Sequence, residues 1–185
     1  IVLTEGQKTS IYGLGNTPIR SIVLPDNVTS IDASAFANCT NLTSVTIGSG
    51  VTTIGSKAFE NCTALTSITI PDNVDRIGEK AFLGCSNLKT VTLPKNLEII
   101  DGGTFQNCER LSSIAIPSGV TSIDGMAFYN CSDLTTIVIP KSVTSINTYA
   151  FDGCILVDTS IIDFNSNKST KSLSLLVLSI SFWKD

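Results

Sequence analysis

The chain has 185 residues, of which 42% are hydrophobic, and a formal net charge of −4 from 12 basic and 16 acidic residues. It has no long basic run, which argues against nucleic-acid binding, because that function needs clustered Lys and Arg to displace counterions from phosphates. Histidine is absent, which excludes Ser-His-Asp and Cys-His catalytic sets, histidine metal ligands and an imidazole proton shuttle.

The first 18 residues lack the Phe and Cys that recur through the rest of the chain. We therefore predict a degenerate N-terminal cap over residues 1–18, followed by a first strand in the sequence IRSIVLP, Ile19 to Pro25. Because the chain begins at Ile1 rather than Met, we expect a processed or truncated piece whose signal peptide is out of view.

An internal repeat of 23 residues dominates residues 19–163. Its two most regular positions are a phenylalanine and, three residues later, a cysteine: Phe36, Phe59, Phe82, Phe105, Phe128, Phe151, and Cys39, Cys62, Cys85, Cys108, Cys131, Cys154. One such unit cannot bury its own apolar side, whereas stacked units bury it against each other. The interval therefore predicts a solenoid of about six coils, in which each repeated position forms a buried column along the stack.

Each repeat divides into two extended pieces and a short turn. Leu65–Ile70 (LTSITI) alternates apolar and polar residues, which predicts a strand with one face inward, and Pro71 ends it. Val74 and Ile77 predict a second extended piece, after which Gly, Asp or Asn in every repeat predicts a bend. The short KAF segment that carries Phe82 is predicted to form one helical or 3₁₀ turn.

Successive side chains of a strand point to opposite sides, so the residues between the core residues point outward. Stacked repeats then place these outward residues in columns. We take these Ser/Thr-rich columns as the candidate contact surface: Thr43, Ser44, Thr46, Thr66, Ser67, Thr69, Lys89, Thr90, Thr92, Ser112, Ser113, Thr135 and Thr136. Threonine also suits a solvated sheet for its own sake, so plain β-propensity is the competing explanation.

Two groups of residues invite a chemical role. An even number of cysteines suggests disulfides, but neighbouring side chains in a parallel stack point the same way, whereas a disulfide needs facing Cβ atoms. No C-x-x-C occurs, which argues against zinc, so we predict six buried free thiols. The carboxylate pairs Asp75 with Glu79 and Glu98 with Asp101 lie at variable turn positions, and we expect solvated charges rather than an acid/base pair.

After Cys154 the match to the repeat fades, and residues 164–185 contain a polar segment and then an apolar run from Leu173 to Trp183. This run is shorter than the roughly 20 residues that a membrane-spanning helix needs. Its serines and partial alternation favour a strand, and we predict a C-terminal β cap over the last coil. The alternative is a homodimer contact made by an exposed apolar edge.

The pattern L-x-x-I-x-I-P-x-x-V-x-x-I-x-x-x-A-F-x-x-C resembles the leucine-rich repeats of the BspA-like, or Treponema pallidum-type, class, over roughly Ile19 to Ile162. The resemblance implies a right-handed solenoid with a parallel β-sheet on its concave side and short 3₁₀ or helical turns on its convex side. It also implies secreted or cell-surface proteins, often bacterial, that attach to host proteins or other cells. It carries over no catalytic residues.

Together these observations favour a non-enzymatic, adhesin-like module that binds a protein partner through the concave face, with no cofactor, metal, nucleic acid or membrane span. The partner would be a host protein, a matrix protein or a protein on a neighbouring cell. One alternative is a passive spacer within a longer repeat array. A further alternative is an ice- or polysaccharide-binding surface, because strands stacked at about 4.7 Å would give a regular array of hydroxyls.

Overall fold

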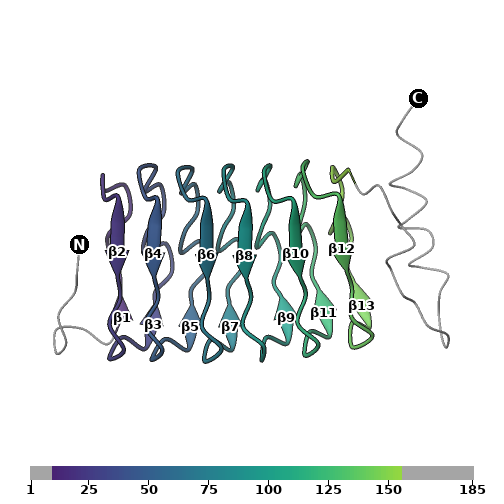
Figure 1. The fold of residues 1–185 in the computed structure, drawn as a ribbon, viewed down its shortest axis with the longest axis horizontal. Helices are drawn as coiled ribbons and strands as arrows, with labels where there is room; N and C mark the ends of the chain where they lie inside the picture. Colours follow the sequence, from purple (N-terminus) through teal and green to yellow (C-terminus); the bar gives the residue numbers. More distant parts are fainter. Residues whose placement is uncertain (1–9, 156–185) are drawn as a thin grey trace.

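The structure is a computed structural model that describes residues 10–155. Within this range the chain forms two rows of short strands stacked along one axis, and it contains no helix (Figure 1). The first row is β2 (Ser21–Val23), β4 (Ser44–Thr46), β6 (Ser67–Thr69), β8 (Thr90–Thr92), β10 (Ser113–Ala115) and β12 (Thr136–Val138). The second row is β1 (Ser10–Ile11), β3 (Ser30–Ile31), β5 (Thr53–Ile54), β7 (Arg76–Ile77), β9 (Ile99–Ile100), β11 (Ser122–Ile123) and β13 (Ser145–Ile146).

Every strand pair in the two rows is parallel, and every pair except β1–β3, in which Ser10 lies opposite Ser30, keeps the 23-residue repeat in register. Ser67 lies opposite Thr90, and Thr53 lies opposite Arg76, so that equal positions of successive repeats stand side by side. In the first row the hydrogen-bonded pairs are β2–β4, β6–β8 and β10–β12, while the second row divides into β1-β3-β5-β7 and β9-β11-β13. The predicted leucine-rich-repeat solenoid with parallel strands is confirmed.

Phenylalanine rings form the spine of the core. The six rings stack one on the next, with neighbouring centroids 5.1 to 5.6 Å apart and planes inclined by 3 to 16°. Five of the rings, from Phe36 to Phe128, are completely buried. Aromatic pairs of this kind contribute about 0.5–1.5 kcal/mol beyond the burial of their area. The repeat interval thus places one ring per coil, and each ring stacks on the ring of the adjacent coil.

The cysteines lie beside this spine as free, buried thiols. The thiol of Cys62 donates to the carbonyl oxygen of Phe36 in the preceding coil, with an Sγ–O distance of 3.2 Å, and Cys85 donates to Phe59 at 3.1 Å. Burial raises the pKa of Cys62 from 9.0 to about 12. Each of these thiols is therefore a small core residue that also satisfies a carbonyl between two coils.

The short KAF segment differs from the helical or 3₁₀ turn that the sequence predicts. The N–H of Phe59 donates to the carbonyl of Ala81 in the next coil at 2.8 Å, whereas the N–H of Glu60 donates back to Lys57 at 3.0 Å. A helix would need every N–H to bond within its own coil. Here, N–H groups that bond within the coil alternate with N–H groups that bond to the next coil. The result is a run of β-turns that joins neighbouring coils.

The alternation depends on left-handed backbone at two positions of each repeat. These positions are Ser34, Lys57, Lys80, Gly103, Met126 and Tyr149, and then Asn38, Asn61, Gly84, Asn107, Asn130 and Gly153. The first of them lies two residues after the Gly/Asp/Asn column at which the sequence predicts the bend. Most residue types at that first position adopt the left-handed backbone conformation only at a cost in free energy. Residue preferences therefore do not predict the left-handed conformation there.

Residues 10–18 cover the first full coil. The N–H of Leu14 donates to Ala35 at 2.9 Å, and the thiol of Cys39 donates to the carbonyl of Leu14 at 3.1 Å. The remaining residues of the predicted cap, 1–9, lie outside the described part of the chain, as do the end of the predicted solenoid and the predicted cap or dimer contact over 164–185. Within residues 10–155, no helix is long and apolar enough to cross a membrane.

Candidate functional site

The outward side chains of the first strand row form a continuous exposed surface, which we call the strand face. It consists of the outward residues of β2, β4, β6, β8, β10 and β12 and the residue before each strand. All thirteen Ser, Thr and Lys residues that the sequence predicts for the contact surface are exposed on it. The central residue of each strand points inward, as Ile68 and Ile114 do, because successive side chains of a strand alternate between its two sides.

Many hydroxyls on the strand face have no partner within the described chain. Thr43 donates to the carbonyl of Arg20 at 3.0 Å. By contrast, the column Thr46, Thr69 and Thr92 makes no side-chain hydrogen bond to any residue in the range 10–155. The hydroxyls of this column are therefore open to water or to a docked molecule.

The character of the strand face changes towards β12. The column begins with the exposed Val23 on β2 and runs through the threonines of β4, β6 and β8. It ends with Ala115 and then Val138, whose side chain is 60% exposed. An exposed valine costs little alone, but next to an exposed alanine it makes an apolar strip beside hydroxyls. This column thus presents hydroxyls on β4, β6 and β8 and apolar side chains on β10 and β12, while Ser113 and Thr136 keep exposed hydroxyls on the same two strands.

A hollow of about 550 Å³ lies where β8 and β10 begin. It is lined by Lys89, Glu109, Arg110, Ser112, Ser132 and Asp133, so that three successive coils contribute to it. Lys89 and Ser112 belong to the strand face itself, whereas the other four residues lie in the turns that lead into β10 and β12. The hollow extends from the residue before β8, past the start of β10, to the turn before β12.

Sequence reasoning missed four of these six residues: Glu109, Arg110, Ser132 and Asp133. The signal was present directly after the cysteine column, where the first three repeats read CTN, CTA and CSN. The next two repeats read CER and CSD at the same place. A comparison of columns between repeats would therefore have shown that charge enters this turn only in the fourth and fifth repeats.

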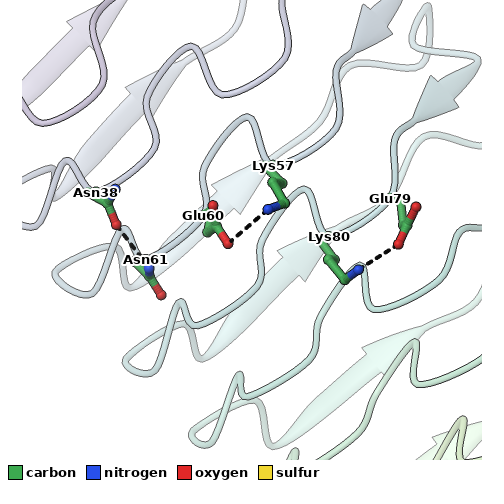
Figure 2. A network of polar contacts seen from close by, with 6 residues as sticks. All are labelled: Asn38, Lys57, Glu60, Asn61, Glu79 and Lys80. Atoms are coloured by element: carbon green, nitrogen blue, oxygen red, sulfur yellow. Dashed lines mark hydrogen bonds and ion pairs between the residues drawn. The ribbon is translucent and has the colours of Figure 1, made fainter.

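The turns that carry the left-handed columns form a second surface, the turn face, and its polar groups bond to each other (Figure 2). Asn61 Nδ2 donates to Asn38 Oδ1 at 2.9 Å, linking two coils. Two ion pairs lie in neighbouring coils, each within its own coil. Lys57 Nζ lies 3.7 Å from Glu60 Oε1, and Lys80 Nζ lies 2.7 Å from Glu79 Oε1.

One carboxylate of each candidate acid/base pair, Glu79 and Asp101, has a basic side chain within 4.0 Å. The hydrogen bond from Lys80 holds the pKa of Glu79 below its usual value. Asp101 Oδ2 lies 4.0 Å from Arg76 Nε, and burial raises the pKa of Asp101, with nearby Asp124 acting in the same direction. Among residues 10–155, no group of three or more Cys, Asp or Glu side chains could hold a metal ion.

Comparison with protein families gives one description over nearly the whole chain. The model for the BspA type leucine rich repeat region matches in six copies, over residues 8–133 and 99–175. Among curated protein sequences, none matches the chain.

Several solved structures share the fold. A leucine rich cell surface protein from Faecalibacterium prausnitzii A2-165 is 38% identical, with a TM-score of 0.74, over 80% of this chain and 40% of its own. A leucine-rich repeat protein from Bacteroides ovatus ATCC 8483 is 29% identical, with a TM-score of 0.64, over 80% of this chain and 45% of its own. The leucine-rich repeat protein of T. pallidum is 25% identical, with a TM-score of 0.81, over 99% of this chain and 83% of its own. The chain thus spans less than half the length of the first two proteins.

Proposed function

The chain belongs to the BspA-type leucine-rich repeat family, and from this premise we propose that it is a protein-binding module that works outside the cell or at its surface. The strand face is the binding surface in this proposal. The similar protein from Faecalibacterium prausnitzii is described as a cell surface protein, which supports the location. Repeat solenoids commonly use such extended faces to bind other proteins, which supports the function.

The observation that carries the proposal is the contrast between open and engaged polar groups. Thr46, Thr69 and Thr92 form an exposed column without side-chain hydrogen bonds in the described chain, next to exposed apolar surface at Ala115 and Val138. Interfaces combine an apolar centre with polar groups that bond on docking, and this face offers both. The role is non-enzymatic, and adhesion to another cell or to matrix is its most specific form.

The test is a binding screen of the chain against immobilised matrix and cell-surface proteins, followed by two matched double variants. Thr69→Glu with Thr92→Glu adds two negative charges to the strand face and should abolish binding, because an unpaired buried charge opposes docking. Its melting temperature should stay nearly unchanged, because both side chains are exposed.

The control is Lys57→Gln with Lys80→Gln, which changes the net charge by the same amount on the turn face. If this control abolishes binding while the strand-face variant binds normally, the turn face is the binding surface. If the screen finds no partner, the passive spacer replaces the proposal. Thermal hysteresis of the wild-type chain, lost in the strand-face variant, would instead favour ice binding by the threonine column.

A further inference from the structure

Within the described part of the chain, the second strand row is continuous except between β7 and β9 (Figure 1). Elsewhere in this row, the N–H of the residue directly after each strand donates to the coil before it, as Gly78 does to Ile54 at 2.8 Å. Within residues 10–155, the N–H of Asp101 makes no such bond to Ile77. The row is thus divided into two blocks, with β1, β3, β5 and β7 in one and β9, β11 and β13 in the other.

Other contacts hold the two blocks together at this junction. On the turn face, the N–H of Phe82 donates to the carbonyl of Thr104 at 2.9 Å, and in the first row β6 pairs with β8. The rings of Phe82 and Phe105 are 5.6 Å apart, the widest of the five ring spacings. The first row has its own interruptions, between β4 and β6 and between β8 and β10, but there the second row is continuous. The junction between β7 and β9 therefore opens on the side of the second row alone.

Close approach between coils explains where the second row can pair. The residue after each second-row strand packs against the backbone of the coil before it. A Cβ added to Gly78 would lie 2.6 Å from the nitrogen of Ser56, and one added to Gly55 would lie 2.5 Å from the nitrogen of Ala33. Cβ atoms do not come this close to other atoms, so paired coils need glycine at such a contact.

Glycine is present at every one of these contacts except one. The facing pairs in the described chain are Gly13 with Asp32, Ala33 with Gly55, Ser56 with Gly78, Glu79 with Asp101, Gly102 with Asp124, and Gly125 with Asn147. Only the pair of Glu79 with Asp101 has a Cβ on both sides. This pair lies between β7 and β9, where the row is interrupted.

We infer that the contact of Glu79 with Asp101 holds the second strand row open between β7 and β9 and makes this junction a joint. The two blocks of coils bend relative to each other there, and they pivot on the β6–β8 pair and the hydrogen bonds of the turn face. Arg76 Nε lies 4.0 Å from Asp101 Oδ2 across the opening, but Arg76 is largely exposed, and an exposed ion pair contributes little.

This joint goes beyond the proposed function, because the bending needs no partner. It does bear on binding, since a molecule docked on the strand face across β6 and β8 contacts both blocks. Such a molecule would favour one angle between the blocks over the others.

The first experiment measures amide hydrogen exchange of the whole chain by NMR, corrected for intrinsic exchange rates. The N–H of Asp75 bonds to the coil before it at 3.0 Å, whereas Glu98, at the same position of the next repeat, makes no such bond within the described chain. We expect the amides of Glu98 and Asp101 to exchange about tenfold or more faster than those of Asp75 and Gly78. Equal protection of the two pairs would overturn the inference.

Matched variants test the cause of the opening. Asp101→Gly and Glu79→Gly each supply the missing glycine from one side of the contact, so either one should slow exchange at Glu98 to the rate at Asp75. Asp101→Ala and Glu79→Ala remove the same carboxylates but keep the Cβ, and exchange at Glu98 should stay fast. If the alanine variants slow exchange as much as the glycine variants, charge repulsion keeps the row open and the inference fails.

The second experiment measures the bending itself. Spin labels on Thr52→Cys and Thr144→Cys place one probe in each block at exposed positions, while the native cysteines in residues 10–155 are buried. The distribution of distances between the labels should be broad in the parent chain and narrower with Asp101→Gly. A parent distribution as narrow as that of the glycine variant would contradict a joint. Melting curves verify that each variant is folded, and if one glycine variant does not fold, the other tests the same contact from the opposite side.

Discussion

The turn face and the strand face come from the same repeat, but they use their polar side chains in opposite ways. On the turn face, Asn61 bonds to Asn38 in the coil before it and Lys80 pairs with Glu79 (Figure 2). On the strand face, the side chains of Thr69, Thr90 and Thr92 make no hydrogen bond within the described chain. The difference teaches that the turns hold the stack together, so that changes there should alter stability, whereas changes on the strand face should alter binding alone.

The largest expected effect concerns the thiols that lie beneath the turns. A pKa of about 12 for Cys62, against 9.0 for a free thiol, lowers its thiolate fraction by about a thousandfold. We expect a thiol reagent to label almost none of the six cysteines in the folded chain and all six in denaturant. Rapid labelling of Cys62 in the folded chain would show that the turns open easily and would weaken the contrast between the two faces.

Removal of one ring from the core should cost more than any change at the surface. Phe82→Ala leaves a cavity between the rings of Phe59 and Phe105, and we expect a loss of about 3–5 kcal/mol in unfolding free energy. Thr69→Ala on the strand face should change it by less than about 0.5 kcal/mol. Chemical denaturation measures both, and equal losses would contradict the assignment of inward and outward positions.

A substitution in the left-handed column tests how tightly the turns are held. Gly84 has a φ of 71°, and an added Cβ would come within contact distance of the Asn61 side chain. Gly84→Ala should therefore lower the unfolding free energy by about 1–2 kcal/mol, whereas Ala115→Ser on the strand face should have almost no effect. A harmless Gly84→Ala would show that the turn face relaxes freely.

The smallest expected effect depends on pH at the bend that leads into the turn face. Burial, with help from Asp124, raises the folded-state pKa of Asp101 above its unfolded value. The folded chain then binds more protons between those two values, so stability should fall as pH rises through that window. Asp101→Asn should remove this loss of stability and raise the melting temperature at neutral pH. At pH values below both pKa values of Asp101, folded and unfolded, the two chains should melt at the same temperature. A melting series in which the two chains stay parallel at every pH would contradict this prediction.

The core of the fold could be predicted from sequence because its signal is periodic. Phe59 and Cys62 recur at a fixed interval, and one interval fixes strand direction, register and stacking together. The turn geometry could not be predicted, because Lys57 adopts a backbone conformation that its residue type disfavours. Backbone hydrogen bonds to Glu79 in the next coil and from Glu60 in the same coil hold it there. The hollow was missed for a different reason. Arg110 and Asp133 differ from the residues at the same position of the other repeats, and a search for recurring positions does not select such residues.

The alternating N–H groups of the turns also bear on how such a chain can change in length. The N–H of Phe59 donates to the carbonyl of Ala81 one coil later, and the N–H of Phe82 donates to the carbonyl of Thr104 in the same way. Each coil therefore offers carbonyl acceptors to the coil before it and N–H donors to the coil after it. A coil duplicated or deleted in frame would meet the same partners at both new junctions. Gene slippage in units of one repeat is therefore structurally neutral for the stack. It divides or duplicates the charged residues near Lys89, because three successive coils supply them. A change in length can in this way keep the fold and still alter the surface that the stack presents.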